Sequence, residues 1–325
     1  MSRILVTGAA GFIGAQVVAG LLAEGHSVVG VDNLNDAYDP RLKAWRLEQL
    51  KGRAGFTFLT LDIGRREDLP QVWAGPPFDG VVNLAARAGV RQSMRDPWTY
   101  AHTNVVGTLN LLEEARQRSV GKFIQASTSS VYGDHNPVPF REDADVSRPL
   151  SPYAATKGAA EQLCHSYHAL YDLDITILRY FTVFGPAGRP DMSIFRFIQW
   201  IAEDRPVRIY GDGTQSRDFT YVGDVVRGTL AALRPAGFEV INLGSDRPVD
   251  LQQVIRELER LLGRKARLEF SAASPGEVRS TRADIGKARR LLAWSPEVSL
   301  EDGLGECVAW YRREREWASA VATPD

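Results

Sequence analysis

Short apolar runs alternate with longer helical patterns through the first half of the chain. Residues 3–7 and 27–32 are runs rich in Val, Ile and Leu, as expected of buried strands, and residues 12–24 repeat apolar side chains at helical spacing. The pattern predicts further strands at 56–60, 80–85, 122–127 and 174–180, and further helices at 100–118 and 153–171. Strands that alternate with helices predict an α/β fold, a doubly wound parallel sheet covered by helices on both faces.

The rhythm changes after about residue 185, where Pro186, Gly188 and Pro190 interrupt the pattern. Helices are predicted near 193–203, 221–233, 250–262 and 299–317, with short strands between them. We therefore expect a first domain over 1–180 and a smaller mixed α/β lobe mainly over 181–317. Some of the later chain is expected to cross back to the first domain, and residues 318–325 to form a frayed tail.

Composition narrows the class of protein. Hydrophobic residues make up 44% of the 325 residues, which is enough for a large core. The 39 Lys and Arg against 40 Asp and Glu give a net charge of −1, which argues against a nucleic-acid partner. Cys164 and Cys307 are the only cysteines, so neither a disulfide framework nor a metal-ligand pattern is predicted. No apolar run of about 18 residues predicts a membrane span, and the expected location is the cytoplasm.

A glycine-rich turn follows the first predicted strand and opens the first helix, in the sequence Gly8-Ala-Ala-Gly11-Phe-Ile-Gly14. Glycine lets the backbone turn tightly and approach a pyrophosphate closely, and a helix N-terminus offers N–H groups and partial positive charge to it. Since strand and helix flank the turn as this motif requires, it predicts a Rossmann-type dinucleotide site.

Acidic residues follow the second and third strands. Asp32 lies 18 residues after Gly14, where a carboxylate can bind the adenosine ribose and repel a 2′-phosphate, which favours NAD over NADP. Asp62, followed by Ile63, is placed to bind the adenine amino group. The alternatives are that Asp32 with Asn33 only ends a strand, and that Asp62 is a solvated turn residue.

Tyr153 and Lys157 lie four residues apart in a predicted helix, so both side chains lie on one face. A free tyrosine titrates near pH 10, and a nearby ammonium and a nicotinium ring would stabilise its anion as a base. Ser151 is a candidate N-cap with Pro152 after it, which places Tyr153 in the first turn. The alternative is an ordinary amphipathic helix with a solvated lysine.

Hydroxyl side chains follow the fifth strand in the sequence Ser127-Thr128-Ser129-Ser130. A hydroxyl here can bind the same substrate oxygen as Tyr153, although a Ser/Thr-rich turn would have the same composition. Together with the glycine turn, these residues predict a catalytic set of Thr128, Tyr153 and Lys157.

With these motifs the chain resembles the extended short-chain dehydrogenase/reductase family, the nucleotide-sugar epimerases and dehydratases. The resemblance also covers 83–91, 104–108, 130–133, 179–181, 217–221 and 275–277. It implies tightly held NAD and oxidation of a sugar hydroxyl to a transient ketone. The NAD contacts that it implies are Gly8, Gly11, Phe12, Ile13, Gly14, Asp32, Asn33, Asn35, Asp62, Ile63, Leu84, Ala85, Ala86, Ala88, Asn104, Ser127, Tyr153, Lys157, Tyr180 and Phe181.

The positions after Thr128 favour epimerisation within this family. Relatives that dehydrate carry Asp-Glu directly after this threonine, and relatives that decarboxylate UDP-glucuronate carry Glu two places after it, whereas this chain has Ser129 and Ser130. Elimination would therefore lack its acid and base. Residues 32–40 and 182–192, with Thr182 and Arg189, resemble the UDP-glucuronate 4-epimerases, and Arg189 would hold the sugar carboxylate directly or by shaping the pocket.

The resemblance also implies a UDP-sugar contact for Arg217 at the diphosphate and for Glu277 near the uridine ribose, in addition to Thr128, Ser129, Ser130 and Tyr153 at the sugar. A salt bridge with Asp218 is the alternative for Arg217. The family resemblance also implies a homodimer, formed through the helices at 100–118 and 153–171. The alternative functions are a 4-epimerase of UDP-glucose/UDP-galactose or an N-acetylhexosamine, and a non-catalytic NAD-binding regulator.

Overall fold

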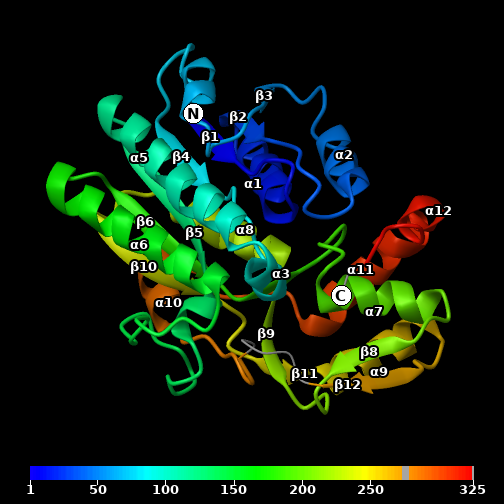
Figure 1. Ribbon diagram of the computed structural model, residues 1–325. Coiled ribbons are helices and arrows are strands. Elements are labelled where there is room, and N and C mark those ends of the chain that lie inside the picture. The colour runs from blue at the N-terminus through cyan, green and yellow to red at the C-terminus, as the bar shows by residue number, and fades with distance from the viewer. Residues whose placement is uncertain (273–277, 324–325) are drawn as a thin grey trace.

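A parallel sheet forms the centre of the first lobe of the computed structural model, which describes residues 1–272 and 278–323 (Figure 1). Its strands are β1 (Arg3–Thr7), β2 (Ser27–Asp32), β3 (Phe56–Thr60), β4 (Gly80–Asn83), β5 (Lys122–Thr128), β6 (Ile175–Tyr180) and β10 (Phe238–Leu243). Their order across the sheet is β10, β6, β5, β4, β1, β2, β3, and every neighbouring pair is parallel. The predicted doubly wound sheet is confirmed.

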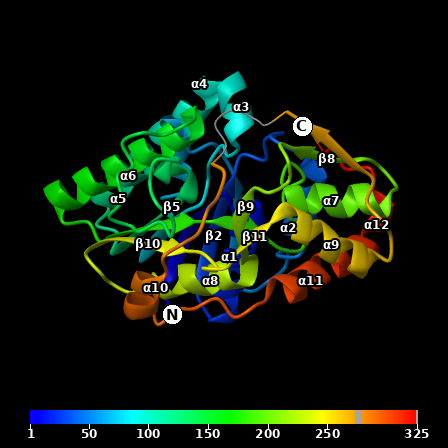
Figure 2. The same cartoon turned by 90° about the horizontal axis from the view of Figure 1, so that it is seen from below.

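Helices cover both faces of this sheet, as Figures 1 and 2 show. One face carries α1 (Phe12–Ala23) and α8 (Val222–Ala231), and the other carries α5 (Gly107–Gln117) and α6 (Pro152–Tyr171). Successive residues of β1 enter the two cores in turn: Ile4 and Val6 pack on the α1 side, whereas Leu5 packs on the α5 side. Burial on both faces explains why these strands are continuous apolar runs.

Shorter helical segments complete this lobe. They are α2 (Pro40–Glu48), η1 (Arg66–Gln71), α3 (Val90–Arg95), α4 (Pro97–Tyr100), η2 (Ala101–Val106), η3 (Ser129–Tyr132) and α10 (Gly286–Leu292). The helix predicted at 100–118 is therefore divided, because η2 is a π-helical turn. The Thr108 hydroxyl donates to Asn104 O over 2.7 Å at this point, so a side chain competes for a backbone carbonyl of the helix.

The second lobe is a mixed α/β unit, as predicted. Two small sheets are formed by β7 (Thr182–Phe184), β9 (Ser216–Tyr221) and β11 (Pro248–Asp250), and by β8 (Val207–Tyr210) and β12 (Leu268–Ser271). The helices are α7 (Ser193–Ala202), α9 (Leu251–Leu262), α11 (Leu300–Arg313) and α12 (Arg315–Ala318). The later chain also returns to the first lobe, since β10 pairs with β6 and α8 packs on α1. The domain boundary at residue 181 stays a prediction.

The chain after α11 is packed on the second lobe, so the expectation of a frayed tail is wrong for its described part. Val321 is 2% exposed and joins the core that α7 and α11 share. Gln199 of α7 donates its amide to Ala318 O over 3.0 Å and to Val321 O over 2.8 Å. These bonds pair the buried amide N–H groups of Gln199 with the chain after α11. None of the described helices is long and apolar enough to cross a membrane.

The packing of Val321 predicts that a substitution there lowers stability, although the sequence analysis placed this residue in a frayed tail. Val321→Ala should lower the free energy of unfolding by about 2 kcal/mol, because two buried methyl groups are lost and a small cavity is left. Ala322→Ser, at the exposed neighbouring position, is the control and should stay within about 0.5 kcal/mol of wild type. Urea unfolding curves measure both, and equal midpoints for the two variants would contradict the packed tail.

Candidate active site

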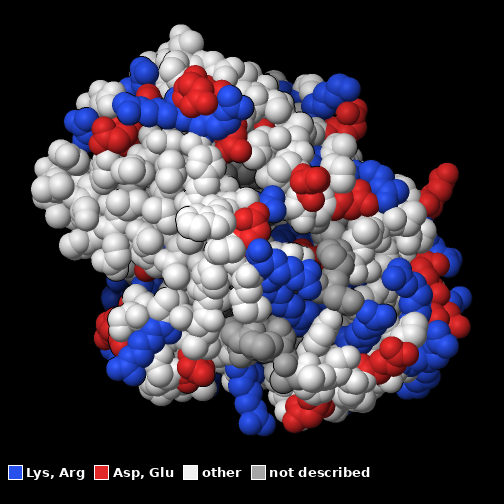
Figure 3. All heavy atoms as spheres, viewed as in Figure 1, with Lys and Arg blue, Asp and Glu red and all other residues white. Residues whose placement is uncertain are grey.

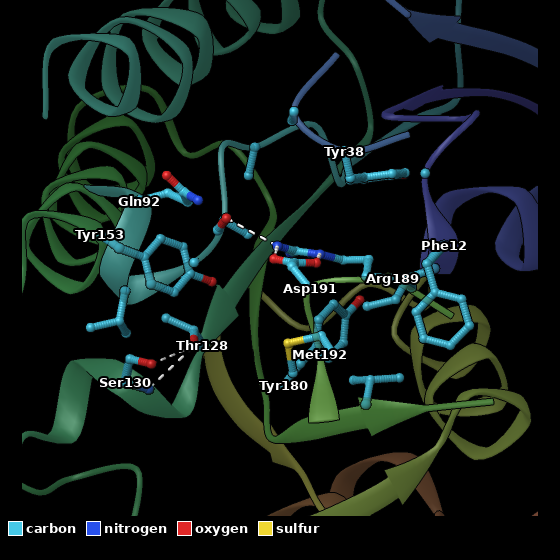
Figure 4. Close-up of a pocket in the computed structure, with 18 of the residues that line it drawn as sticks. Phe12, Tyr38, Gln92, Thr128, Ser130, Tyr153, Tyr180, Arg189, Asp191 and Met192 are labelled. Carbon is cyan, nitrogen blue, oxygen red and sulfur yellow. Dashed lines mark hydrogen bonds and ion pairs between the residues drawn. The ribbon is translucent and has the colours of Figure 1, made fainter. Parts of the chain in front are cut away.

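A large cavity of about 490 Å³ opens at the carboxyl ends of the parallel strands. Its walls are the loops after β1, β2, β4, β5 and β6, with α7, β8 and β9 of the second lobe opposite them. Because parallel strands all end at the same edge, residues far apart in the sequence meet there. Figure 4 shows Tyr153 and Thr128 on one side of this cavity and Arg189, Tyr38 and Phe12 on the other.

The glycine turn forms a cradle that side chains would fill. Gly8 has φ +69°, and a Cβ on Gly14 would lie 2.0 Å from Gly8 O, so neither position accepts another residue without a backbone shift. Gly11 is the N-cap of α1, and no side chain caps this helix. The N–H groups of the first turn are therefore available to an anion in the cavity, as a dinucleotide pyrophosphate would need.

Asp32 lies at the end of β2 and lines the cavity, as predicted from its position. Its carboxylate accepts hydrogen bonds from Ala10 N over 3.2 Å and from Leu34 N over 2.8 Å. It also forms a buried ion pair of 3.0 Å with Lys43 of α2, which the sequence reading did not single out. The lysine offsets much of the charge that was expected to repel a 2′-phosphate.

Asp62 and the two asparagines after Asp32 form one polar cluster at the same end. Asn33 donates to Asp62 Oδ2 over 2.7 Å, and Asn35 donates to Asn33 Oδ1 over 2.7 Å. Gly64 N donates to the other oxygen of Asp62 over 2.8 Å, which is the bond of a solvated turn residue. Asp62 also lines the cavity. The structure is therefore compatible with both interpretations of Asp62, as a contact of the adenine and as a turn residue.

Tyr153 stands in the first turn of α6, as the capping pattern predicts. Ser151 Oγ accepts a hydrogen bond from Ala154 N over 3.2 Å, and Pro152 is the first helical residue. Tyr153 and Lys157 both line the cavity one helical turn apart, and Lys157 is 3% exposed. The alternative of a solvated lysine is therefore wrong.

Burial shifts the pKa values of Tyr153 and Lys157 in opposite directions. Burial raises the pKa of Tyr153, whereas the Thr128 hydroxyl and the charge of Arg189 lower it. Burial lowers the pKa of Lys157 to about 8, against the attraction of Glu161. In the protein alone, burial therefore outweighs the groups that stabilise the tyrosine anion.

The hydroxyl residues at the end of β5 and the start of η3 all line the cavity, but their side chains have different partners. Thr128 Oγ1 accepts from Ser130 N over 3.2 Å, so it caps η3 while facing Tyr153 across the cavity (Figure 4). Ser127 instead donates its hydroxyl to Glu161, which also forms a buried ion pair of 2.7 Å with Arg179. Ser129 and Ser130 line the cavity with no carboxylate at either position.

Arg189 is held in place by its own loop. Its Nε donates to Asp191 Oδ1 over 3.0 Å, and its Nη2 donates to Asp191 Oδ2 and to Ala88 O. Burial opposes both charges, but each partner holds the other ionised: the pKa of Arg189 is raised and that of Asp191 is lowered. Asp191 therefore occupies the Nε–Nη2 edge of Arg189, so this edge shapes the cavity and is not available to grip a substrate carboxylate.

Arg217 of β9 also lines the cavity, and it donates to Ser216 O over 2.9 Å. Its neighbour Asp218 is fully buried and accepts from Ser245 N, Asp246 N and Ala283 N, so this carboxylate serves the interior of the second lobe. Glu277, predicted near the uridine ribose, lies outside the described residues.

Most of the predicted contacts lie on the cavity wall. They are Gly8, Gly11, Phe12, Ile13, Gly14, Asp32, Asn33, Asn35, Asp62, Ile63, Leu84, Ala85, Ala86, Ala88, Ser127, Thr128, Ser129, Ser130, Tyr153, Lys157, Tyr180, Phe181, Thr182, Arg189 and Arg217.

Asn104 is an exception, because it is buried away from the cavity wall. Its Oδ1 accepts from Arg87 N over 2.8 Å, and its Nδ2 donates to Arg87 O and to Thr156 Oγ1 over 3.0 Å each. The amide therefore braces the loop after β4 against α6, and the NAD contact of Asn104 stays a prediction.

Several cavity residues were missed by the sequence reading, among them Tyr38, Lys43, Arg91, Asp191, Arg196 and Arg208. Tyr38 and Lys43 flank the start of α2, whose N-cap is Asp39 with Pro40 as first residue. This Asp-Pro pair is a helix-start signal and could have revealed the helix. The arginines come from α3, α7 and β8, and no local pattern marks them as facing the cavity.

Comparison with known proteins places this geometry in a family. The model of the "NAD dependent epimerase/dehydratase family" matches residues 4–244. The chain is 52% identical over 322 residues to a UDP-glucuronate 4-epimerase of Thermodesulfobacterium geofontis, covering 99% of each chain.

Two solved structures are similar over nearly the whole chain. UDP-glucuronic acid 4-epimerase from Bacillus cereus, in complex with UDP-glucuronic acid and NAD, is 42% identical with a TM-score of 0.90, covering 96% of this chain and 99% of that one. UDP-glucose 4-epimerase from Thermotoga maritima, with UDP-glucose, is 34% identical with the same TM-score and the same coverage. The protein belongs to the NAD dependent epimerase/dehydratase family.

Proposed function

We propose that the protein interconverts UDP-glucuronate and UDP-galacturonate by epimerisation at C4, with NAD as its cofactor. The observation that carries this proposal is the cavity that joins the glycine turn to Tyr153, Lys157 and Thr128, with hydroxyls where a dehydratase or decarboxylase would carry carboxylates. The 52% identity to a UDP-glucuronate 4-epimerase, over 99% of both chains, supports the choice of sugar.

The glycine turn fits a dinucleotide. A Cβ at Gly8 would meet Ala85 N at 2.8 Å, so glycine lets the turn pack closely on the loop after β4. The uncapped start of α1 then faces the cavity, where a pyrophosphate would bind. Asp32 would hold the adenosine ribose and Asn33 and Asn35 the adjoining groups. NAD bound there would supply the hydride acceptor for oxidation at C4 of the sugar and, once reduced, the hydride donor for the return step.

Tyr153 acts as the base and acid of the reaction. Its hydroxyl faces the cavity beside Thr128, where a sugar 4-OH can bind both (Figure 4). The tyrosinate takes the proton of the 4-OH during oxidation and gives it back after the sugar has turned. Because burial raises the pKa of Tyr153, the anion needs positive charge nearby, and Lys157 on the same helix face supplies it.

The carboxylate of UDP-glucuronate sets a second requirement. After oxidation at C4 the sugar is a β-keto acid. Such an acid loses CO₂ when the bond to its carboxylate, C5–C6, stands perpendicular to the plane of the ketone. Ser129, Ser130 and Thr182 line the cavity and would hold the carboxylate by hydrogen bonds in the unreactive plane. Arg189, fixed by Asp191, closes the opposite wall, and Arg217 would meet the diphosphate of the UDP group, with Glu277 near its ribose.

Proton NMR of the sugar tests this function. Purified protein incubated with UDP-glucuronate should produce UDP-galacturonate without CO₂ loss. Tyr153→Phe should lower kcat/KM at least about 10³-fold, because it removes the proton-transferring group and little else. Tyr221→Phe is the matched control and should keep near-wild-type activity, since Tyr221 is not among the described residues of the cavity wall.

Three other results of the NMR experiment would each contradict a part of the proposed function. UDP-pentose as main product would refute the argument from Ser129 and Ser130. Conversion of UDP-glucose but not of UDP-glucuronate would move the assignment to the neutral-sugar epimerases. The UDP-glucose 4-epimerase of Thermotoga maritima, which is similar to this chain, is one of these. Undiminished activity of Tyr153→Phe would remove this residue from the mechanism.

The pH dependence of kcat/KM tests the role of Lys157. Burial lowers its pKa to about 8, so the ammonium is lost as the pH rises through this value, and kcat/KM should fall with a midpoint near 8. Lys157→Arg should be slower by about tenfold or more, because the guanidinium is bulkier, yet show no fall below about pH 10, since arginine stays charged. The same alkaline midpoint in both proteins would contradict this role.

We propose further that two copies pair through the helices at 100–118 and 153–171. Apolar side chains stand exposed on this side: Trp98 is 82% exposed, and Val106, Leu109 and Leu170 are also exposed. Figure 3 shows a broad uncharged surface over α5 and α6. A second copy would remove this area from water.

The buried, unpaired Cys164 and Cys307 fit a reducing compartment, and we propose the cytoplasm.

Sedimentation equilibrium tests the dimer. The wild-type protein should have twice the mass of the chain at micromolar concentration, and Leu109→Glu with Leu170→Glu should raise the dissociation constant at least about 100-fold, because two charges on each copy would lose their water. Leu291→Glu, at an exposed leucine of α10, is the control and should stay dimeric. Wild-type monomers would refute the proposal, as would equal masses for all three proteins.

A further inference from the structure

A buried arginine connects the cofactor side of the cavity to the sugar side. Arg46 lies on α2 and is 3% exposed. Its guanidinium reaches the glycine turn at Ala10, the cavity wall at Tyr38, and the loop of residues 185–191 that carries Arg189. These three segments are far apart in the sequence, and Arg46 itself does not line the cavity among the described residues.

Every N–H of this guanidinium has a partner. Nη1 donates to Ala10 O over 3.3 Å and to Tyr38 Oη over 2.7 Å. Nη2 donates to Ala187 O over 2.6 Å and to Gly188 O over 3.3 Å, and Nε donates to Ala187 O over 3.2 Å. All five bonds end on neutral oxygens, and no described carboxylate forms an ion pair with Arg46. A lysine has neither the fork nor the number of directions to replace these contacts.

The loop that Arg46 holds has a conformation that needs support. Ala187 has φ +52°, which residues with a Cβ rarely adopt. Two of the five bonds of Arg46 fix the carbonyl of this same residue, and a third fixes the next one. The other end of the loop is fixed by Arg189, which pairs with Asp191 and donates to Ala88 O over 3.0 Å.

The two arginines therefore hold the loop from opposite sides. Arg46 ties it to the glycine turn, where Ala10 N also donates to Asp32. Arg189 ties it to the loop after β4. Tyr38, the third partner of Arg46, lies on the same side of the cavity as Arg189 (Figure 4).

We propose that Arg46 is a positioning residue that fixes the loop of residues 185–191 on the glycine turn and thereby keeps the sugar carboxylate in the orientation that resists loss of CO₂. This inference rests on the proposed function, since it concerns the fate of the 4-keto hexuronate. Arg46 acts through Arg189 and the loop and does not touch the substrate.

The chemistry that it restrains is balanced within the sugar. Loss of CO₂ breaks the C5–C6 bond, and the electron pair of this bond forms the enolate of the C4 ketone. A proton from water then adds at C5, which leaves a 4-keto pentose nucleotide. The step is favoured when the C5–C6 bond lies parallel to the π system of the ketone. A loop that moves by about 1 Å is enough to change such an alignment.

The test compares Arg46→Lys and Arg46→Met with Arg41→Met, a change at an exposed arginine of the same helix whose partner is Asp39. UDP-glucuronate labelled with ¹⁴C in the carboxylate is supplied, and the CO₂ released is measured per UDP-galacturonate formed. Both Arg46 variants should raise this ratio at least about tenfold, and Arg41→Met should leave it at the wild-type value. Arg46→Lys keeps a buried cation and serves where Arg46→Met fails to fold.

Hydrogen exchange of the peptide covering residues 185–192 gives a readout that needs no substrate. Exchange should be faster in the Arg46 variants than in Arg41→Met. Unchanged exchange would overturn the positioning role, and faster exchange with an unchanged CO₂ ratio would overturn the control of product. If wild-type protein converts no UDP-glucuronate, the proposed function fails, whereas the exchange experiment still decides whether Arg46 holds the loop.

Discussion

The parallel direction of the strands is the constraint on which the site depends. Every neighbouring pair of the seven-stranded sheet is parallel, so the chain leaves β1, β2, β4, β5 and β6 at the same edge. The glycine turn, Asp32, the loop after β4, Thr128 and Phe181 are brought together for this reason alone. The tight contact of Gly14 with Gly8 then sets the start of α1 at that edge.

Buried and half-buried charge pairs hold the cavity wall in shape. Asp32 with Lys43, Glu161 with Arg179, and Asp191 with Arg189 each place an ion pair beside or behind it. Removing one partner of such a pair leaves an uncompensated buried charge, so these contacts resist displacement. A rigid wall suits a reaction in which the sugar must turn between two hydride transfers while its carboxylate keeps one orientation. The absence of carboxylates at 129 and 130 removes the groups that would divert the intermediate.

The sequence predicted the parts of the molecule that local patterns determine. Continuous apolar runs located the buried strands, and Ser151 with Pro152 located the start of α6. The helix α2 was missed because its buried residues include Lys43 and Arg46, so no apolar stripe marks it. Contacts between distant segments decided the rest. The bond from Arg189 to Ala88, the bracing role of Asn104 and the packed Val321 depend on partners that no local spacing reveals. The roles of the cavity residues in binding and catalysis stay predictions.

Transfer of the C4 hydrogen tests the central claim most directly. UDP-glucuronate that carries deuterium at C4 should yield UDP-galacturonate that keeps this deuterium at C4, since the same hydrogen leaves and returns within one active site. The account also predicts that no deuterium enters at C4 or C5 when unlabelled substrate reacts in D₂O. Loss of the label to water, or incorporation from D₂O at either carbon, would contradict an epimerisation through hydride transfer at C4.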